Sequence, residues 1–147
     1  MTPRSFKQIR VRYRLAAVAT IVAAVTLGYW VRFHGPGPEW LNDALGSVAY
    51  EVFWIALFWG CFAGRTFSAE RSPFKISVGV LLATCGLEFL QLWQPPFLQA
   101  LRAPLPGRLV LGNTFNWTDF PPYIVGSVLG YLWVKFLSKA LPIEHSR

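Results

Sequence analysis

Residues 86–94 read Gly-Leu-Glu-Phe-Leu-Gln-Leu-Trp-Gln, an apolar stretch with polar side chains at Glu88, Gln91 and Gln94. In a helix this three-residue spacing places the carboxyl and the two amides on one face. An ionisable side chain within a membrane span is costly and usually faces the bundle interior or a water-filled cavity. The stretch therefore predicts a membrane helix whose polar stripe meets polar groups from other helices.

The composition indicates an integral membrane protein. Of the 147 residues, 54% are hydrophobic and 14% are charged, whereas a soluble domain carries about 25% charged residues. The mean hydropathy is +0.39. The net charge of +7 comes from basic residues that flank apolar runs, which favours a role in membrane orientation over nucleic-acid binding.

No metal or other cofactor is expected. Cys61 and Cys85 both lie in apolar runs and lack metal-ligand spacing. Neither His34 nor His145 lies near the centre of a span, which disfavours haem ligation within the bundle.

Four apolar segments, at about residues 15–32, 44–64, 76–94 and 122–141, are long enough to span a bilayer. Basic residues concentrate in residues 1–14, 65–75 and 135–147, so both termini are expected on the cytoplasmic side. The sequence therefore predicts an all-α fold: one membrane domain over residues 1–147, forming a four-helix bundle with a long outer loop between the third and fourth spans. Tryptophans expected at the outer interface, as in an aromatic belt, are Trp30, Trp40, Trp93 and Trp117.

Small residues predict where the helices pack closely. Ala16, Thr20, Ala24 and Gly28 recur every fourth residue in the first span, and the last span has the GxxxG pair Gly126 and Gly130. In the long connection, residues 97–101 are expected to form a short helix in the membrane interface. Asp119, followed by two prolines, predicts the start of the last helix.

Polar side chains from all four spans are predicted to meet on the outer side. From a rise of about 1.5 Å per residue, Glu51 lies roughly 10 Å and Glu88 roughly 9 Å below the outer ends of their spans. Ser47 shares a face with Glu51. Two carboxylates in a low dielectric need cations or hydrogen bonds, so either Arg32 or Arg102 pairs with one of them or a glutamate stays protonated. The alternative hypothesis is that this network only sets helix register.

The same residues carry a family resemblance. Glu88-x-x-Gln91, Arg102 and the run from Leu111 through Asp119 and Tyr123 to Gly126 and Gly130 resemble the bacterial membrane family catalogued as domain of unknown function 2809. That family is itself similar to the VanZ-like proteins, whose last helix follows the pattern Asp-x-x-x-Asn-x-x-Gly-x-x-x-Gly. Here Tyr123 stands in place of the asparagine.

A second departure lies in the second span. The family commonly has Gly-Asp-x-x-Tyr, and this chain has Gly-Ser-Val-Ala-Tyr at residues 46–50. Glu51, one turn after Ser47 on the same helix face, is expected to supply the missing acid. The resemblance implies a bacterial multi-pass inner-membrane protein with no established reaction. The VanZ-like relatives are associated with resistance to teicoplanin-type antibiotics, and that role reaches this chain only by analogy.

Three functions are compatible with these patterns. The first is a non-enzymatic protein that binds the headgroup of a lipid or a lipid-linked envelope precursor, with Arg32 and Arg102 holding an anion and with Glu88, Gln91 and Asp119 orienting them. The second is a structural or assembly subunit of a membrane complex, and the third is a small proton-coupled transporter that uses Glu88 or Glu51 and acts as a dimer. No nucleophile–base set or phosphate loop favours an enzyme. The ligand-binding candidates are Arg32, Ser47, Glu51, Glu88, Gln91, Arg102, Asp119 and Tyr123.

Overall fold

The structure is a computed structural model that describes residues 3–62 and 72–141, and its described residues are helices joined by short connections. Four of the helices are long and apolar enough to cross a membrane, which confirms the prediction of an all-helical membrane fold. The elements are α1 (Pro3–His34), α2 (Glu39–Phe62), α3 (Ser72–Gln91), α4 (Pro96–Arg102), α5 (Leu105–Leu111), the 3-10 turn η1 (Trp117–Asp119) and α6 (Phe120–Ala140).

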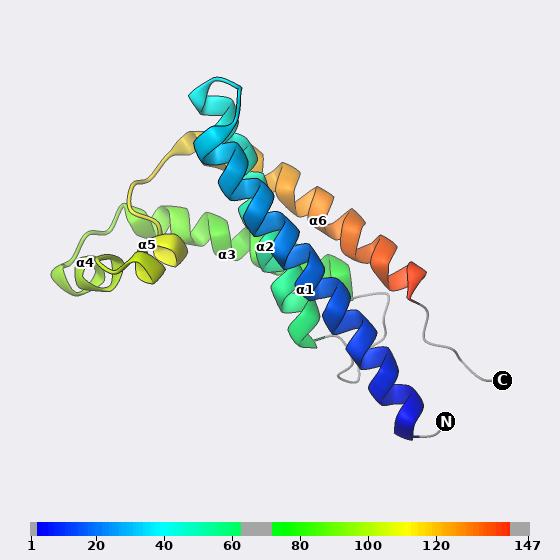
Figure 1. Ribbon diagram of the computed structural model, residues 1–147. Coiled ribbons are helices and arrows are strands. Elements are labelled where there is room, and N and C mark those ends of the chain that lie inside the picture. The colour runs from blue at the N-terminus through cyan, green and yellow to red at the C-terminus, as the bar shows by residue number, and fades with distance from the viewer. Residues whose placement is uncertain (1–2, 63–71, 142–147) are drawn as a thin grey trace.

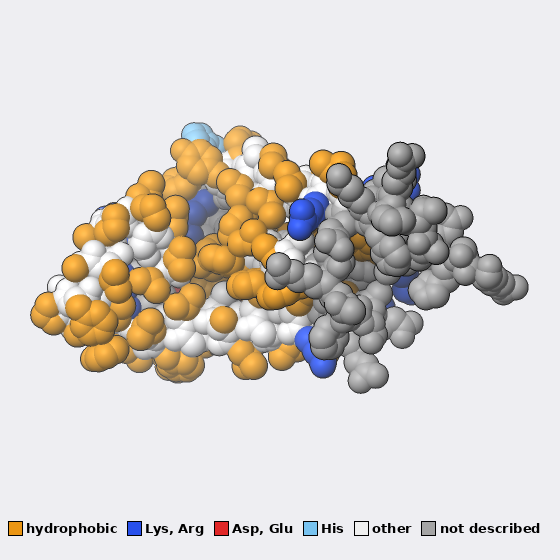
Figure 2. Space-filling model, turned by 90° about the horizontal axis from the view of Figure 1, so that it is seen from below, with side chains coloured by type: hydrophobic (Ala, Val, Ile, Leu, Met, Phe, Trp, Pro, Cys, Tyr) orange, Lys and Arg blue, Asp and Glu red, His pale blue; other side chains and the backbone are white. Residues whose placement is uncertain are grey.

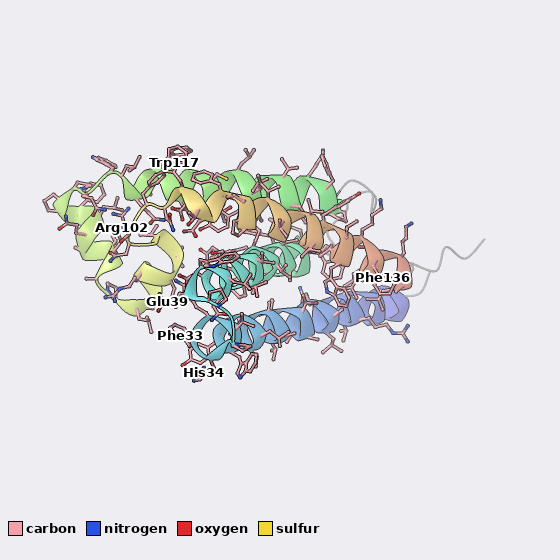
Figure 3. The ribbon with its side chains drawn as sticks, turned by 90° about the horizontal axis from the view of Figure 1, so that it is seen from above. Phe33, His34, Glu39, Arg102, Trp117 and Phe136 are labelled. Atoms are coloured by element: carbon pink, nitrogen blue, oxygen red, sulfur yellow. The ribbon has the colours of Figure 1, made fainter. Side chains whose placement is uncertain are left out.

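The two central helices are α2 and α6. Helix α1 packs on α2, α2 packs on α6, and α3 contacts both α6 and α2. Figure 3 shows α2 and α6 lying between α1 and α3. In Figure 1, α3 is steeply inclined to α1, and its last turn leads into α4 and α5 at one end of the molecule. This end is called the α4–α5 end below.

The opposite end is formed by the start of α1 and the end of α6. The Tyr13 hydroxyl donates to the Leu141 carbonyl at 2.6 Å, and its ring meets the Trp59 ring edge-on at 5.4 Å. An apolar core fills the bundle at this level, made of Tyr13, Ala17, Ile55, Trp59, Val80 and Val134. This end is called the termini end below.

Small residues allow the helices to approach closely where the sequence predicted it. A Cβ added at Gly28 would lie 2.7 Å from Ala49 Cβ on α2. A Cβ at Gly126 would lie 2.6 Å from Glu51 Cβ, and one at Gly130 would lie 2.6 Å from Ile55 Cδ1. All three glycines therefore pack against α2, as expected for small-residue helix contacts in membranes.

Helix α3 has a polar inner face and an apolar outer face. The polar residues on its buried side are Ser77, Thr84, Glu88 and Gln91. Apolar side chains such as Leu82 and Phe89 are more than half exposed. In a bilayer the outer face contacts lipid and the polar groups are kept for the bundle interior.

The helix boundaries differ from the predicted spans in several places. Helix α1 extends from Pro3 to His34, beyond the predicted 15–32, and α3 begins at Ser72 instead of 76. Helix α2 begins at Glu39, five residues before the predicted start at 44, because Pro38 and an acid in the first turn favour helix initiation there. Helix α3 ends at Gln91 instead of 94, because the residue before a proline disfavours helical geometry and Pro95-Pro96 follows. Gln94 is therefore outside the polar stripe, and its amide donates to the Gln91 carbonyl at 2.6 Å.

The connection between α3 and α6 is ordered by two features. The predicted helix at 97–101 is present as α4, and α5 follows it. A cluster of aromatic rings, made of Phe89, Phe115, Trp117 and Phe120, holds the chain before α6 with ring centroids 4.9 to 6.2 Å apart. Asp119 occupies the N-cap position of α6, ahead of the prolines, as predicted, but its side chain makes no capping hydrogen bond.

Candidate functional site

The carboxyl of Glu88 is held by two donors from the far part of the chain. It is 3% exposed. The Tyr123 hydroxyl on α6 donates to its Oε1 at 2.8 Å, and the backbone N–H of Asn116 donates to its Oε2 at 3.4 Å. Glu88 therefore faces the bundle interior, and it ties α3 to the beginning of α6.

The carboxyl of Glu51 lies deeper and is less well satisfied. It is fully buried, and its Cβ packs on Gly126. The Ser127 hydroxyl donates to Oε1 at 2.7 Å, whereas Oε2 has no hydrogen-bond partner. The Thr84 hydroxyl lies beside this carboxyl, but the α3 carbonyls of Val80 and Leu81 accept from that hydroxyl at 3.1 and 3.0 Å. An unsatisfied buried oxygen in the bundle interior costs free energy.

The acids form a series from the bundle interior to the α4–α5 end. Glu51 and Glu88 both lie within electrostatic range of Cys85, which is on α3 between their levels. Asp119 lies within electrostatic range of Glu88 and also of Arg32 and Asp43. Glu51 on α2 therefore meets Ser127 of α6, and Glu88 on α3 meets Tyr123 of α6. Arg32 of α1 instead lies beside Asp43 of α2.

Arg32 does not pair with Glu51 or Glu88, which was one of the two predicted pairings. Its guanidinium lies 3.6 Å from Asp43 on α2, and both side chains are about half exposed, at 50% and 57%. The alkyl part of Arg32 packs against Gly46. Because Arg32 lies in the last turn of α1, it remains half exposed beside Asp43. We call Arg32, Asp43 and Asp119, which lies within electrostatic range of both, the rim cluster.

Arg102 does not pair with a carboxylate either. It is 3% exposed, and its guanidinium donates to the carbonyls of Leu90 at 2.9 Å and Trp93 at 3.2 Å. These carbonyls end α3, and basic side chains commonly satisfy the last carbonyls of a helix. Arg102 therefore takes its hydrogen-bond partners from the end of α3 and the residues just after it, and not from Glu88, Gln91 or Asp119.

The other candidates have mainly packing environments. Ser47 is buried on the same side of α2 as Glu51. Gln91 is buried and lies against Gly112, whose φ of +66° requires the freedom of glycine. Tyr123 is the exception, because its hydroxyl reaches Glu88 on the neighbouring helix.

Several contributing residues were not predicted. Ser127 lies one helical turn after Tyr123, Thr84 lies one turn before Glu88, and Asp43 lies near the start of α2. The i, i+4 spacing to a predicted site residue is the signal that identifies the first two. Asn116 contributes only its backbone N–H, a contact for which side-chain patterns carry no signal.

The chemistry of the site is that of carboxyls and hydroxyls with one surface cation. Among the side chains that the structure describes, no group of three His, Cys, Asp or Glu residues is placed to hold a metal ion. Carboxyl groups in such a setting accept hydrogen bonds, hold protons and attract cations.

Comparison with known proteins assigns the family. The chain matches the family described as "Protein of unknown function (DUF2809)" over residues 36–127, and it belongs to this family. The match covers Glu51, Glu88, Arg102 and Asp119 and ends at Ser127, so it includes both buried carboxyls and their side-chain donors. No solved structure matches the chain.

Proposed function

We propose that this chain is a multi-pass protein of the bacterial inner membrane that binds the headgroup of a lipid or lipid-linked envelope precursor at its α4–α5 end. The termini end is then cytoplasmic, because the basic residues of the chain concentrate in residues 1–14, 65–75 and 135–147. The α4–α5 end faces the outside. The proposed partner is a membrane lipid, and neither nucleic acid nor a cofactor is involved.

The observation that carries this proposal is the rim cluster. Arg32 and Asp43 form a loose, half-exposed ion pair at 3.6 Å, and Asp119 lies within electrostatic range of both. Exposed ion pairs of this kind contribute about 0–1 kcal/mol to stability. Stability alone therefore does not explain why these charged side chains lie at the end of a span. A ligand with a phosphate and an ammonium group complements all three, since guanidinium suits phosphate geometry and carboxylates attract ammonium.

This proposal differs from the sequence-based hypothesis in the role of Arg102. The buried guanidinium of Arg102 is already committed to the end of α3, so Arg32 is the proposed phosphate partner. Glu88 lies within electrostatic range of Asp119 and is hydrogen-bonded to Tyr123, and we place both residues on the inner side of the proposed site.

The test is lipid retention measured by native mass spectrometry after mild detergent extraction. Arg32→Ala is expected to lower the bound fraction of phosphatidylethanolamine at least several-fold relative to the unmodified chain. The matched control is Arg12→Ala, which removes an exposed arginine from the same helix at the termini end. Equal retention in Arg32→Ala and Arg12→Ala, or no retained lipid in the unmodified chain, would contradict the proposal.

The two alternative functions stay as hypotheses with their own tests. Proton-coupled transport predicts pH-dependent flux in proteoliposomes that Glu88→Gln abolishes. An assembly role predicts a stoichiometric membrane partner in pull-down experiments, and a homo-oligomer predicts self-association in nanodiscs.

A further inference from the structure

The connection between α3 and α6 exposes a regular row of large apolar side chains. Trp93, Phe97, Leu101, Leu105 and Leu109 recur every fourth residue, and each is 56% to 66% exposed. We call this row the apolar row. None of these residues lies in the helices long enough to span the membrane. Figure 2 shows hydrophobic side chains over the end of the molecule where Figure 1 places α4 and α5.

The two faces of α4 are distinct. Leu98 and Arg102, one turn apart, are buried at 4% and 3% exposure, whereas Phe97 and Leu101, also one turn apart, are both 56% exposed. Helix α5 has no buried residues, and Leu105 and Leu109 project from it one turn apart. A soluble loop of this length usually exposes polar side chains, so the exposed faces need an apolar environment.

Three hydrogen bonds and one close packing contact fix this segment in place. Arg102 donates to the carbonyls at the end of α3. The Tyr50 hydroxyl on α2 donates to the Val110 carbonyl at 3.3 Å, and Gln91 packs against Gly112 directly after α5. The apolar row is therefore held in a defined position by α2 and α3.

The backbone of the segment suits a poorly hydrated environment. At the ends of the two helices, the N–H of Ala103 donates to Gln99 O at 2.9 Å and the N–H of Gly112 donates to Arg108 O at 3.1 Å. Prolines occupy first-turn positions of both helices, where no backbone donor is needed. Non-helical backbone at membrane depth is unfavourable because its N–H and C=O groups lack hydrogen-bond partners. The helical geometry of α4 and α5 reduces the number of such groups in this segment.

From these observations we propose that α4 and α5 form an interfacial element that lies in one leaflet of the bilayer, with the apolar row in contact with lipid acyl chains. The occupant of this surface is lipid, because the row is continuous along the chain with the lipid-facing side chains Phe89 and Leu92 at the end of α3. Arg108 on α5 is exposed, and its guanidinium reaches lipid phosphates from this depth. This proposal does not depend on ligand binding at the rim cluster.

The experiment is spin-label accessibility in nanodiscs of phosphatidylethanolamine and phosphatidylglycerol. Single cysteines are placed at Leu101, Leu105 and Leu109 in the full chain after Cys61→Ser and Cys85→Ala. Oxygen concentrates in the acyl region, and a nickel chelate stays in water. The matched controls are Gln99→Cys and Asn113→Cys, which lie on the same segment, are polar and are exposed.

We expect labels in the apolar row to collide mainly with oxygen and the control labels to collide mainly with the nickel chelate. Nickel accessibility at Leu101, Leu105 and Leu109 equal to that of the controls would overturn the proposal. Protection of these labels from both reagents, with spin–spin broadening, would also overturn it and would assign the surface to a second copy of the chain. Retention of the circular-dichroism spectrum identifies variants that keep the helical fold.

Discussion

The two halves of the bundle are held together by different interactions. Near the termini end, Ile55, Trp59 and Val134 pack with almost no exposure and form an apolar core. Toward the α4–α5 end, the interior is filled by carboxyls, hydroxyls and amides, and Glu51 retains an oxygen without a partner. Helix association in membranes relies on close packing and interhelical hydrogen bonds, because lipid is as apolar as the core.

This difference indicates where function should be sought. An apolar half shows that the four helices can pack without ionisable groups. Burying the side chains of the polar half costs more free energy, because carboxyls inside a membrane without a cation beside them are unfavourable. The family match over residues 36–127 covers Glu51, Glu88 and Asp119 of the polar half. We therefore expect substitutions in the apolar half to change stability alone and those in the polar half to change ligand binding as well.

The largest expected effect lies in the apolar half. Trp59→Ala should lower the free energy of unfolding by about 3–5 kcal/mol, because it leaves a cavity beside Tyr13 and Ile55 that the helices fill only in part. Thermal unfolding in detergent micelles measures the change. Phe136→Ala, at a position 60% exposed on α6, is the control and should have little effect. Equal destabilisation by the two variants would show that the apolar half is not a packed core.

A smaller effect is expected where α6 crosses α2 beneath Glu51. Gly126→Ala should destabilise the protein by about 1–3 kcal/mol, because the added methyl group forces the helix backbones apart. Its Cβ would lie 2.6 Å from Glu51 Cβ, whereas a Cβ at Gly86 on α3 meets nothing within 4 Å. Gly86→Ala is therefore the matched control and should be neutral or stabilising. If both variants unfold at the same temperature, α2 and α6 do not cross at Gly126.

The smallest effect is expected for a single interhelical hydrogen bond of the polar half. Tyr123→Phe removes the hydroxyl that donates to Glu88 and should cost about 1 kcal/mol, since such bonds in membranes average about 0.6 and reach about 1.7 kcal/mol. Tyr131→Phe, which removes a hydroxyl partnered by the exposed Lys135, serves as the control. A double-mutant cycle with Glu88→Ala, which removes the acceptor, measures the coupling, and a coupling of zero would mean that the two side chains do not interact.

Much of the fold was predictable from local patterns. Apolar segments of membrane length predicted the four long helices, and the glycine spacing predicted the contact faces of α1 and α6. The inward direction of Glu88 followed from the cost of exposing a carboxyl to lipid. The end of α3 was placed three residues too late, because the apolar pattern continues to Gln94 while the prolines already disfavour helix before it.

The partners of the charged side chains were not predictable in the same way. Arg102 was expected to meet a carboxylate or a ligand, and it meets the carbonyls at the end of α3. A long flexible side chain in a connection can reach many groups, and backbone carbonyls carry no sequence signal. Arg32 was also assigned to the buried acids, but its position at the end of α1 leaves it beside Asp43 at the surface.

The sequence alone determined that this chain has four helices long and apolar enough to cross a membrane and that the carboxyls of Glu51 and Glu88 face the bundle interior. Both follow from the free energy of transferring apolar and charged groups between water and hydrocarbon, which depends on residue type and local order. Only the tertiary structure decided which groups meet: Ser127 with Glu51, Tyr123 with Glu88 and Arg102 with α3. Those pairings depend on how the helices cross and how the connection folds back, which residue order does not specify.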